Sequence, residues 1–137
     1  MASRVVIKLG GGLITDKGSM KKFDSDSMER VADSISSVVE MGLPIVIVHG
    51  AGSFGHLLAK EWSISEGVDQ KIAEEQRMIV DEIRSDMREL NGLVIDKLAN
   101  SELESEGLPP RNGRLVLDQI SKVTLQISKE WLRSPSP

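Results

Sequence analysis

The sequence has no cysteine and no tyrosine, and phenylalanine and tryptophan contribute only two residues each. Without cysteine there is no disulfide framework, no thiolate nucleophile and no zinc site built on thiolates. The longest purely aliphatic run, Ile45 to Val48, is far shorter than the roughly 20 residues of a membrane-spanning helix. The apolar segment before Lys8 is also too short for a signal peptide. These absences predict a cytoplasmic protein without a membrane segment.

Basic residues are not gathered into a surface that would suit nucleic acid. The formal net charge is -4, and most of the negative charge lies between residues 61 and 108. Binding of nucleic acid needs clustered lysine and arginine, usually with aromatic rings for single strands. We therefore expect no nucleic-acid partner. A small anionic ligand stays possible, because it needs only a few cations and backbone N–H groups.

Two short apolar segments, residues 4–9 and 45–49, are each followed by a glycine turn and then by a helical pattern. Behind the first turn, apolar residues recur at helical spacing from Met28 to Val38. Asp26 and Glu29 are the expected N-cap and N3 pair of that helix. The length of 137 residues fits one domain.

The repeated order of strand, glycine turn and helix predicts an α/β fold with a largely parallel sheet flanked by helices on both faces. The strands at 4–9 and 45–49 should lie next to each other. A long helix is predicted from Asp69 to Leu98, with Asn91-Gly92 as a point where it bends or divides. Residues 115–133 fit either a helix or a strand, and their periodicity does not decide between the two.

Both glycine turns, Gly10 to Gly12 and Gly50 to Gly52, follow the carboxyl ends of predicted parallel strands. Ligands bind at that end of α/β sheets, and the free amides at the start of the next helix favour phosphate. Neither turn carries a P-loop or a dinucleotide-binding fingerprint. No pattern of histidine and acidic residues indicates a metal site.

Four basic side chains near these turns are candidates for chemistry. Lys8 lies in a strand expected to be buried, where an ammonium needs an anionic partner. The alternative is a lysine whose stem packs while its charge reaches solvent. Lys17 is either a solvated loop residue or a ligand for an anion. His49 closes the second strand and His56 opens the following helix, and a single histidine in such a place is more often structural than catalytic.

The run Lys8-Leu9-Gly10-Gly11-Gly12, followed by Thr15-Asp16-Lys17, resembles the opening of proteins of the amino acid kinase family. The run from His49 to His56 reads His-Gly-Ala-Gly-Ser-Phe-Gly-His. It narrows the resemblance to the isopentenyl phosphate kinases within that family. Serine or alanine is usual in the family where this chain has Gly12. The resemblance covers residues 4–109.

On the donor side, the resemblance implies that the γ-phosphate of ATP is transferred to isopentenyl phosphate. Lys8 and the amides of Gly10, Gly11 and Gly12 would contact the ATP phosphates. Mg²⁺ would be held mainly through the nucleotide, with no metal site of the chain's own. Phosphoryl transfer suits such a site, because positioning and charge neutralisation supply most of its catalysis.

On the acceptor side, the resemblance implies that Lys17 stabilises the transferring phosphoryl group. Gly52 would face the nucleotide, and Ala51 would contact the substrate through its backbone. His56 would hydrogen-bond the substrate phosphate, whereas His49 is expected to hold the turn in place.

Family members are longer by this resemblance, and their second half carries the adenine site. Residues 1–109 are therefore predicted to form the acceptor-binding region, and 110–137 a divergent or truncated tail. The chain alone is expected to bind the acceptor weakly and to turn over negligibly. Uncovered sheet edges and apolar surface would favour a homo-oligomer.

Two further interpretations of the sequence stay open. One is a non-catalytic module that binds phosphate or mediates dimerisation. The second is a fragment of a different amino acid kinase with a carboxylate substrate, for which the Ser-Phe-Gly-His run would be coincidental.

Overall fold

The computed structural model describes residues 4–108 and 123–127. Four parallel strands form one sheet in the order β1-β2-β4-β3. The strands are β1 (Val5–Leu9), β2 (Ile45–His49), β3 (Ser105–Leu108) and β4 (Val123–Ile127). β1 and β2 pair in parallel from Val5 opposite Ile45 to Leu9 opposite His49. The predicted α/β class and the predicted neighbourhood of the first two strands are both confirmed.

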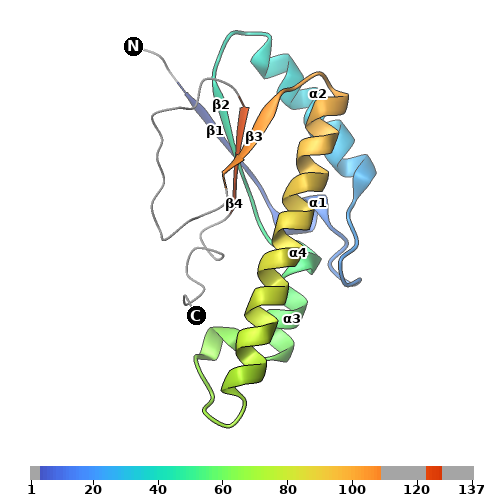
Figure 1. Ribbon diagram of the computed structural model, residues 1–137. Helices are drawn as coiled ribbons and strands as arrows, with labels where there is room; N and C mark the ends of the chain where they lie inside the picture. Colours follow the sequence, from blue (N-terminus) through green and yellow to red (C-terminus); the bar gives the residue numbers. More distant parts are fainter. Residues whose placement is uncertain (1–3, 109–122, 128–137) are drawn as a thin grey trace.

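Among the described residues, four α-helices accompany this sheet, and Figure 1 labels them in chain order. They are α1 (Gly11–Ile14), α2 (Ser25–Val39), α3 (His56–Glu61) and α4 (Ala73–Asn100). Two short 3-10 turns lie at Gly52–Phe54 and Ile64–Glu66. α4 continues without interruption through Asn91-Gly92, so the expected division at that point is wrong. Among the described residues, no helix combines the length and apolarity that crossing a bilayer requires.

The N-cap of α2 is Asp24 and not Asp26 as the sequence pattern predicted. The backbone N–H of Ser27 donates to Asp24 Oδ1 at 3.0 Å, and the Ser27 hydroxyl donates to Asp24 Oδ2 at 2.9 Å. These hydrogen bonds lower the pKa of the Asp24 carboxyl, the backbone bond being the main cause. An N-cap oxygen must reach the backbone amide two or three residues ahead, and Asp24 does so toward Ser27.

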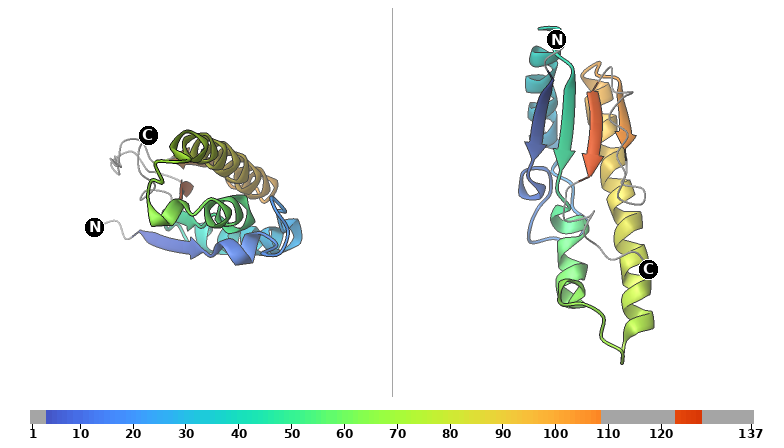
Figure 2. Two further views of the ribbon diagram at one scale, coloured as in Figure 1. Left: turned by 90° about the horizontal axis from the view of Figure 1, so that it is seen from below. Right: turned by 90° about the vertical axis from the view of Figure 1, so that its left-hand side faces the viewer.

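Helices α2 and α4 lie side by side on one face of the sheet, as the two views of Figure 2 show. Their buried side chains meet the inward side chains of β1 and β2 in a single core. That core includes Leu9, Met28, Ile35, Ile45, Ile47, Met87, Leu90, Val94 and Leu98. The described helices thus cover one face, and the expectation of helices on both faces is not met within the part of the chain that is described.

β1 lies at the edge of the sheet that the described strands form, and its residues alternate between the core and the opposite face. Val6 is 65% exposed, and Lys8, two residues further on, is exposed as well. The expectation that Lys8 is buried and needs an anionic partner is therefore wrong. The apolar run suggested burial on both sides, but an edge strand covered by helices on one face leaves every second side chain in solvent.

The segment 115–133, which periodicity left open, contains strand β4 at Val123–Ile127. β4 lies between β2 and β3 and runs parallel to both. Alternation of apolar and polar residues was the correct signal for these five positions. The remaining positions of that segment lie outside the described residues.

Candidate functional site

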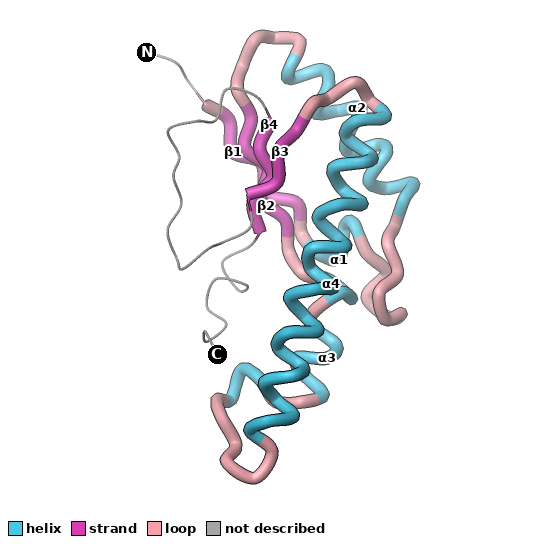
Figure 3. The backbone as a smooth tube through the Cα atoms, in the orientation of Figure 1, coloured by secondary structure: helices cyan, strands magenta, loops and turns pink. Residues whose placement is uncertain are grey.

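The two glycine turns touch each other through their backbones. β1 and β2 end at the same level of the sheet, so the segments that follow them emerge side by side, as Figure 3 shows. A Cβ added to Gly11 would collide with the amide nitrogen of Gly52 and lie 2.6 Å from its Cα. A Cβ on Gly50 would lie 3.0 Å from the amide nitrogen of Gly11. Glycine is required at these positions because one backbone packs directly on the other.

Two buried hydroxyl residues, Thr15 and Ser53, join the turns, and neither was predicted from the sequence. The Thr15 hydroxyl donates to the carbonyl of Gly11 at 2.7 Å and accepts the backbone N–H of Ser53 at 3.0 Å. Both residues are at most 3% exposed. The only sign of this role in the sequence is that both residues lie inside the glycine motifs. A serine or threonine that joins two segments has no spacing pattern that distinguishes it from one that is exposed to solvent.

Lys17 reaches back over the first glycine turn. A Cβ on Gly12 would collide with Lys17 Cε and lie 3.0 Å from Nζ, so the ammonium stands beside this turn. The side chain of Lys17 is otherwise exposed and accessible to a ligand. Gly12 has no side chain and therefore leaves room for this conformation of the lysine.

The turns also present unused backbone donors. Among the described residues, no hydrogen bond uses the amides of Gly10, Gly11, Gly12 or Gly52. The first three follow one another at the start of α1, and Gly10 has open space around its Cα. Successive backbone N–H groups beside an ammonium form the arrangement that binds an anion such as phosphate.

The remaining predicted site residues lie near the two glycine turns. Lys8 lies on the exposed face of β1, two residues before Gly10. Ala51 is half-buried immediately before the 3-10 turn, and His56 is exposed as the first residue of α3. Direct contacts therefore unite Gly11, Gly12, Lys17 and Gly52, with Lys8, Ala51 and His56 in neighbouring positions along the chain.

His49 is fully buried at the end of β2. Its Nδ1 lies 3.0 Å from the carbonyl oxygen of Gly50, and its Nε2 lies 3.2 Å from Oδ1 of Asn91 on α4. Burial lowers the pKa of the ring and favours its neutral form. A neutral ring has one N–H, which Nδ1 donates to Gly50. Nε2 then accepts a hydrogen bond from the side-chain amide of Asn91. For this the Asn91 amide is rotated by a half-turn, so that its nitrogen takes the place of Oδ1. This geometry supports the structural role expected for His49.

We expect His49 to make stability depend on pH. Its pKa is lowered from the ordinary 6.5, so below that pH the unfolded chain binds a proton that the folded chain resists. The stabilisation is complete above about pH 6.5 and declines as pH falls through the folded pKa, at no more than about 1.4 kcal/mol per pH unit. Urea unfolding at about pH 7.5 and about pH 5.5 should show this loss. A His49→Gln variant with an equally large decline would contradict the assignment.

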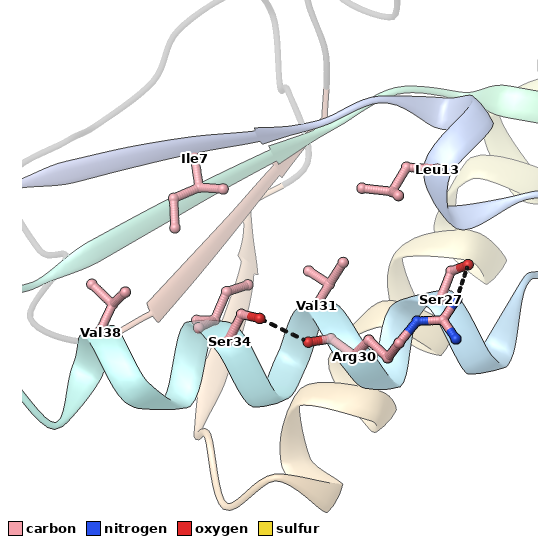
Figure 4. A pocket seen from close by; sticks show the side chains of 8 residues that line it. Ile7, Leu13, Ser27, Arg30, Val31, Ser34 and Val38 are labelled. Atoms are coloured by element: carbon pink, nitrogen blue, oxygen red, sulfur yellow. Dashed lines mark hydrogen bonds between the residues drawn. The ribbon is translucent and has the colours of Figure 1, made fainter.

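A separate apolar cavity of about 350 Å³ lies between β1, α1 and α2. Figure 4 shows its lining, with the Arg30 guanidinium donating to the Ser27 hydroxyl at 3.3 Å on one side. Leu13, Val31 and Val38 supply part of its apolar surface. None of the predicted site residues lines this cavity. Among the described residues, no cluster of three or more histidine and acidic side chains could hold a metal ion.

Comparison with known proteins shows that the chain belongs to the amino acid kinase family, whose model matches residues 3–134. The isopentenyl phosphate kinase of Methanocaldococcus jannaschii is 30% identical over 135 residues, which cover 93% of this chain and 51% of that protein. A uridylate kinase of Rhodococcus jostii is 32% identical over 109 residues, or 79% of this chain and 38% of that protein. One X-ray structure of isopentenyl phosphate kinase superimposes with a TM-score of 0.75 at 28% identity, over 91% of this chain and 56% of that one.

The resemblance that the two glycine motifs predicted is thereby confirmed at the level of family and fold. The chain spans about half the length of the isopentenyl phosphate kinases that it matches. The division expected at residues 109 and 110 stays a prediction, as does the cytoplasmic location.

Proposed function

We propose that this chain forms the phosphoryl-acceptor part of an ATP-dependent kinase that converts isopentenyl phosphate to isopentenyl diphosphate. The observation that carries the proposal is the contact between the two glycine turns, with unused amides and the Lys17 ammonium beside them. Cationic and N–H groups of this kind are what a transferring phosphoryl group requires. The names of the related kinases, together with the motif that ends in His56, favour isopentenyl phosphate as the acceptor.

In the proposed reaction, a terminal oxygen of isopentenyl phosphate attacks the γ-phosphorus of ATP, and the bond to the bridging oxygen of ADP breaks. The amides of Gly10, Gly11 and Gly12 would hold phosphate oxygens of ATP, with Lys8 adding positive charge. Mg²⁺ bound to the nucleotide would supply further positive charge next to the phosphates.

Lys17 would neutralise the phosphoryl group during transfer, because its ammonium already stands beside the first turn. On the acceptor side, Ala51 would meet the substrate through its backbone and His56 would donate a hydrogen bond to its phosphate. Gly52 would face the nucleotide where the turns meet. The protein contributes little covalent chemistry in such a mechanism and works by holding donor and acceptor in line.

A second candidate within the family is a nucleotide acceptor, which the relationship to a uridylate kinase favours. A carboxylate acceptor, and a non-catalytic module that binds phosphate or mediates dimerisation, are the third and fourth candidates. The three kinase candidates predict different acceptors, so binding experiments separate them, whereas the module would bind phosphate without turnover of ATP. A homo-oligomer is also proposed, since β1 is a sheet edge that exposes Val6.

Calorimetric titration of the 137-residue chain tests the acceptor. We expect binding of isopentenyl phosphate in preference to uridylate and to acetylglutamate, and preference for either of these two would overturn the proposed substrate. A coupled ADP-release assay then tests the reaction. Because the chain spans about half of its relatives, we expect negligible turnover from these residues alone. Turnover of about 1 s⁻¹ would show that they complete a site by themselves.

A further inference from the structure

The loop that carries Lys17 is closed at its base. Thr15 and Phe23 form an antiparallel bridge, and the backbone N–H of Asp16 donates to the carbonyl of Lys22 at 2.9 Å. Within the loop, the amide of Ser19 donates to the carbonyl of Asp16 at 3.3 Å. Lys17 therefore lies on a short, hydrogen-bonded loop whose position depends on what holds its base.

Ser53 fixes one side of that base to the second glycine turn. Its carbonyl accepts the backbone N–H of Lys21 at 3.1 Å, and its hydroxyl accepts the backbone N–H of Lys22 at 3.3 Å. The amide of Ser53 donates to Thr15. Ser53 is buried, belongs to the second glycine turn and contacts both ends of the loop.

Lys21 fixes the other side of the loop to α4. Its ammonium lies 3.1 Å from Asp86 Oδ1 and 2.7 Å from Glu89 Oε2. The hydrogen bonds to Glu89 and Asp86 raise the pKa of Lys21 above its ordinary value. The φ angle of Lys21 is 54°, a left-handed conformation that is uncommon for a residue with a Cβ and that persists only where its surroundings hold it.

Asp86 shows that this contact is more than a solvated surface pair. Its side chain is 9% exposed, and Oδ2 is buried without a hydrogen-bond partner among the described residues. A carboxylate in that environment depends on a nearby cation. The ion pair with Lys21 supplies it, so α4 and the loop are held in one arrangement.

We propose that Lys21 is a positioning residue for Lys17: its ion pairs with α4 hold the loop so that the Lys17 ammonium stays beside Gly12. Lys21 itself contacts no reacting group in this arrangement, because its ammonium is directed to Asp86 and Glu89. The proposal rests on the proposed function only where it says that Lys17 meets a phosphate.

Amide hydrogen exchange on the ligand-free chain tests the structural part. The double variant Lys21→Met/Asp86→Asn removes the pair without leaving an unpaired charge buried. Lys22→Met is the matched control, because its 66% exposed side chain pairs only with Asp16 of the same loop, at 3.6 Å, among the described residues. We expect the amides of Asp16 and Ser19 to exchange about tenfold faster in the double variant than in the control. Equal rates, or a uniform rise that includes the core of α4, would overturn the proposal.

Titration with Mg-ATP tests the positioning part through a double-mutant cycle. Lys21→Met and Lys17→Ala should each weaken Mg-ATP binding by about tenfold, and the combination should weaken it no further than Lys17→Ala alone. Lys21→Arg, which keeps the charge, should restore most of the affinity. Independent, additive effects of Lys21 and Lys17 would overturn the proposal. If the parent chain binds no Mg-ATP, the proposed contact of Lys17 with ATP phosphates fails for these residues alone, and the exchange experiment still decides whether Lys21 holds the loop.

Discussion

Replacing Gly52 with alanine is expected to lower the free energy of unfolding by about 2–5 kcal/mol, which is a large fraction of the stability of a small domain. Gly52 has a φ angle of +50°, which a residue with a Cβ rarely adopts. The added Cβ would also collide with the Thr15 hydroxyl and lie 2.6 Å from the carbonyl oxygen of Gly11. Backbone atoms of the neighbouring turn cannot move aside cheaply, so the two turns would separate. Urea unfolding monitored by circular dichroism measures the change.

Control variants at two other glycines separate the effect of backbone strain from the effect of close contact between the turns. Gly42 has a φ angle of +81° but nothing within 4 Å of an added Cβ, so Gly42→Ala shows the effect of strain alone. Gly10 has an ordinary φ angle of -61° and the same open space, so Gly10→Ala should leave stability nearly unchanged. We expect a loss of about 1–2 kcal/mol for Gly42→Ala. If Gly52→Ala lost no more than Gly42→Ala, close contact between the turns would not be important for stability.

The His56→Ala variant is expected to bind isopentenyl phosphate about 10- to 150-fold more weakly than the parent chain. The loss corresponds to one charge-assisted hydrogen bond, about 1.5–3 kcal/mol. His56 is exposed at the start of α3, directly after the 3-10 turn that begins with Gly52. Calorimetric titration of both proteins at the same salt concentration gives the ratio of dissociation constants.

Lys60→Ala is the matched control for this experiment. Lys60 is exposed in the last turn of the same helix, so the variant removes a basic side chain without touching the glycine turn. It should change the affinity for isopentenyl phosphate less than about twofold, as screened surface charges do. Equal affinity of His56→Ala and the parent would refute the role of His56 as an anchor of the acceptor phosphate.

The elements that local sequence determines were predicted with useful accuracy. Short apolar runs that end in glycine predicted β1 and β2, and their order with helices predicted a parallel arrangement. The long helical periodicity located α4 to within a few residues at either end. The alternation between Val123 and Ile127 was visible, but it competed with a helical pattern until pairing with β2 and β3 settled it. The prediction of Asp26 as the N-cap of α2 is wrong by one half-turn of chain, because the N-cap is the residue at which the backbone enters the helix, and that residue is Asp24.

Contacts between segments that are far apart in the sequence could not be predicted from local patterns. The pair of Lys21 with Asp86, and the hydrogen bonds that join Ser53 to the Lys17 loop, bring together residues that are 65 and about 31 positions apart. Neither the charges nor the hydroxyls have any periodicity that marks their partners. The exposure of Lys8 was also misjudged, since whether a strand is central or at an edge depends on which strands pair with it.

The sequence by itself determined the α/β class, the two adjacent strands and the glycine turns that follow them, because hydrophobic periodicity and the conformational freedom of glycine act over a few residues. Only the tertiary structure decided that the two turns touch, that Lys17 lies over Gly12, and that α4 holds both the Lys17 loop and His49. These features depend on packing and ion pairing between segments far apart in the chain, and such interactions exist only once the sheet and its helices have assembled.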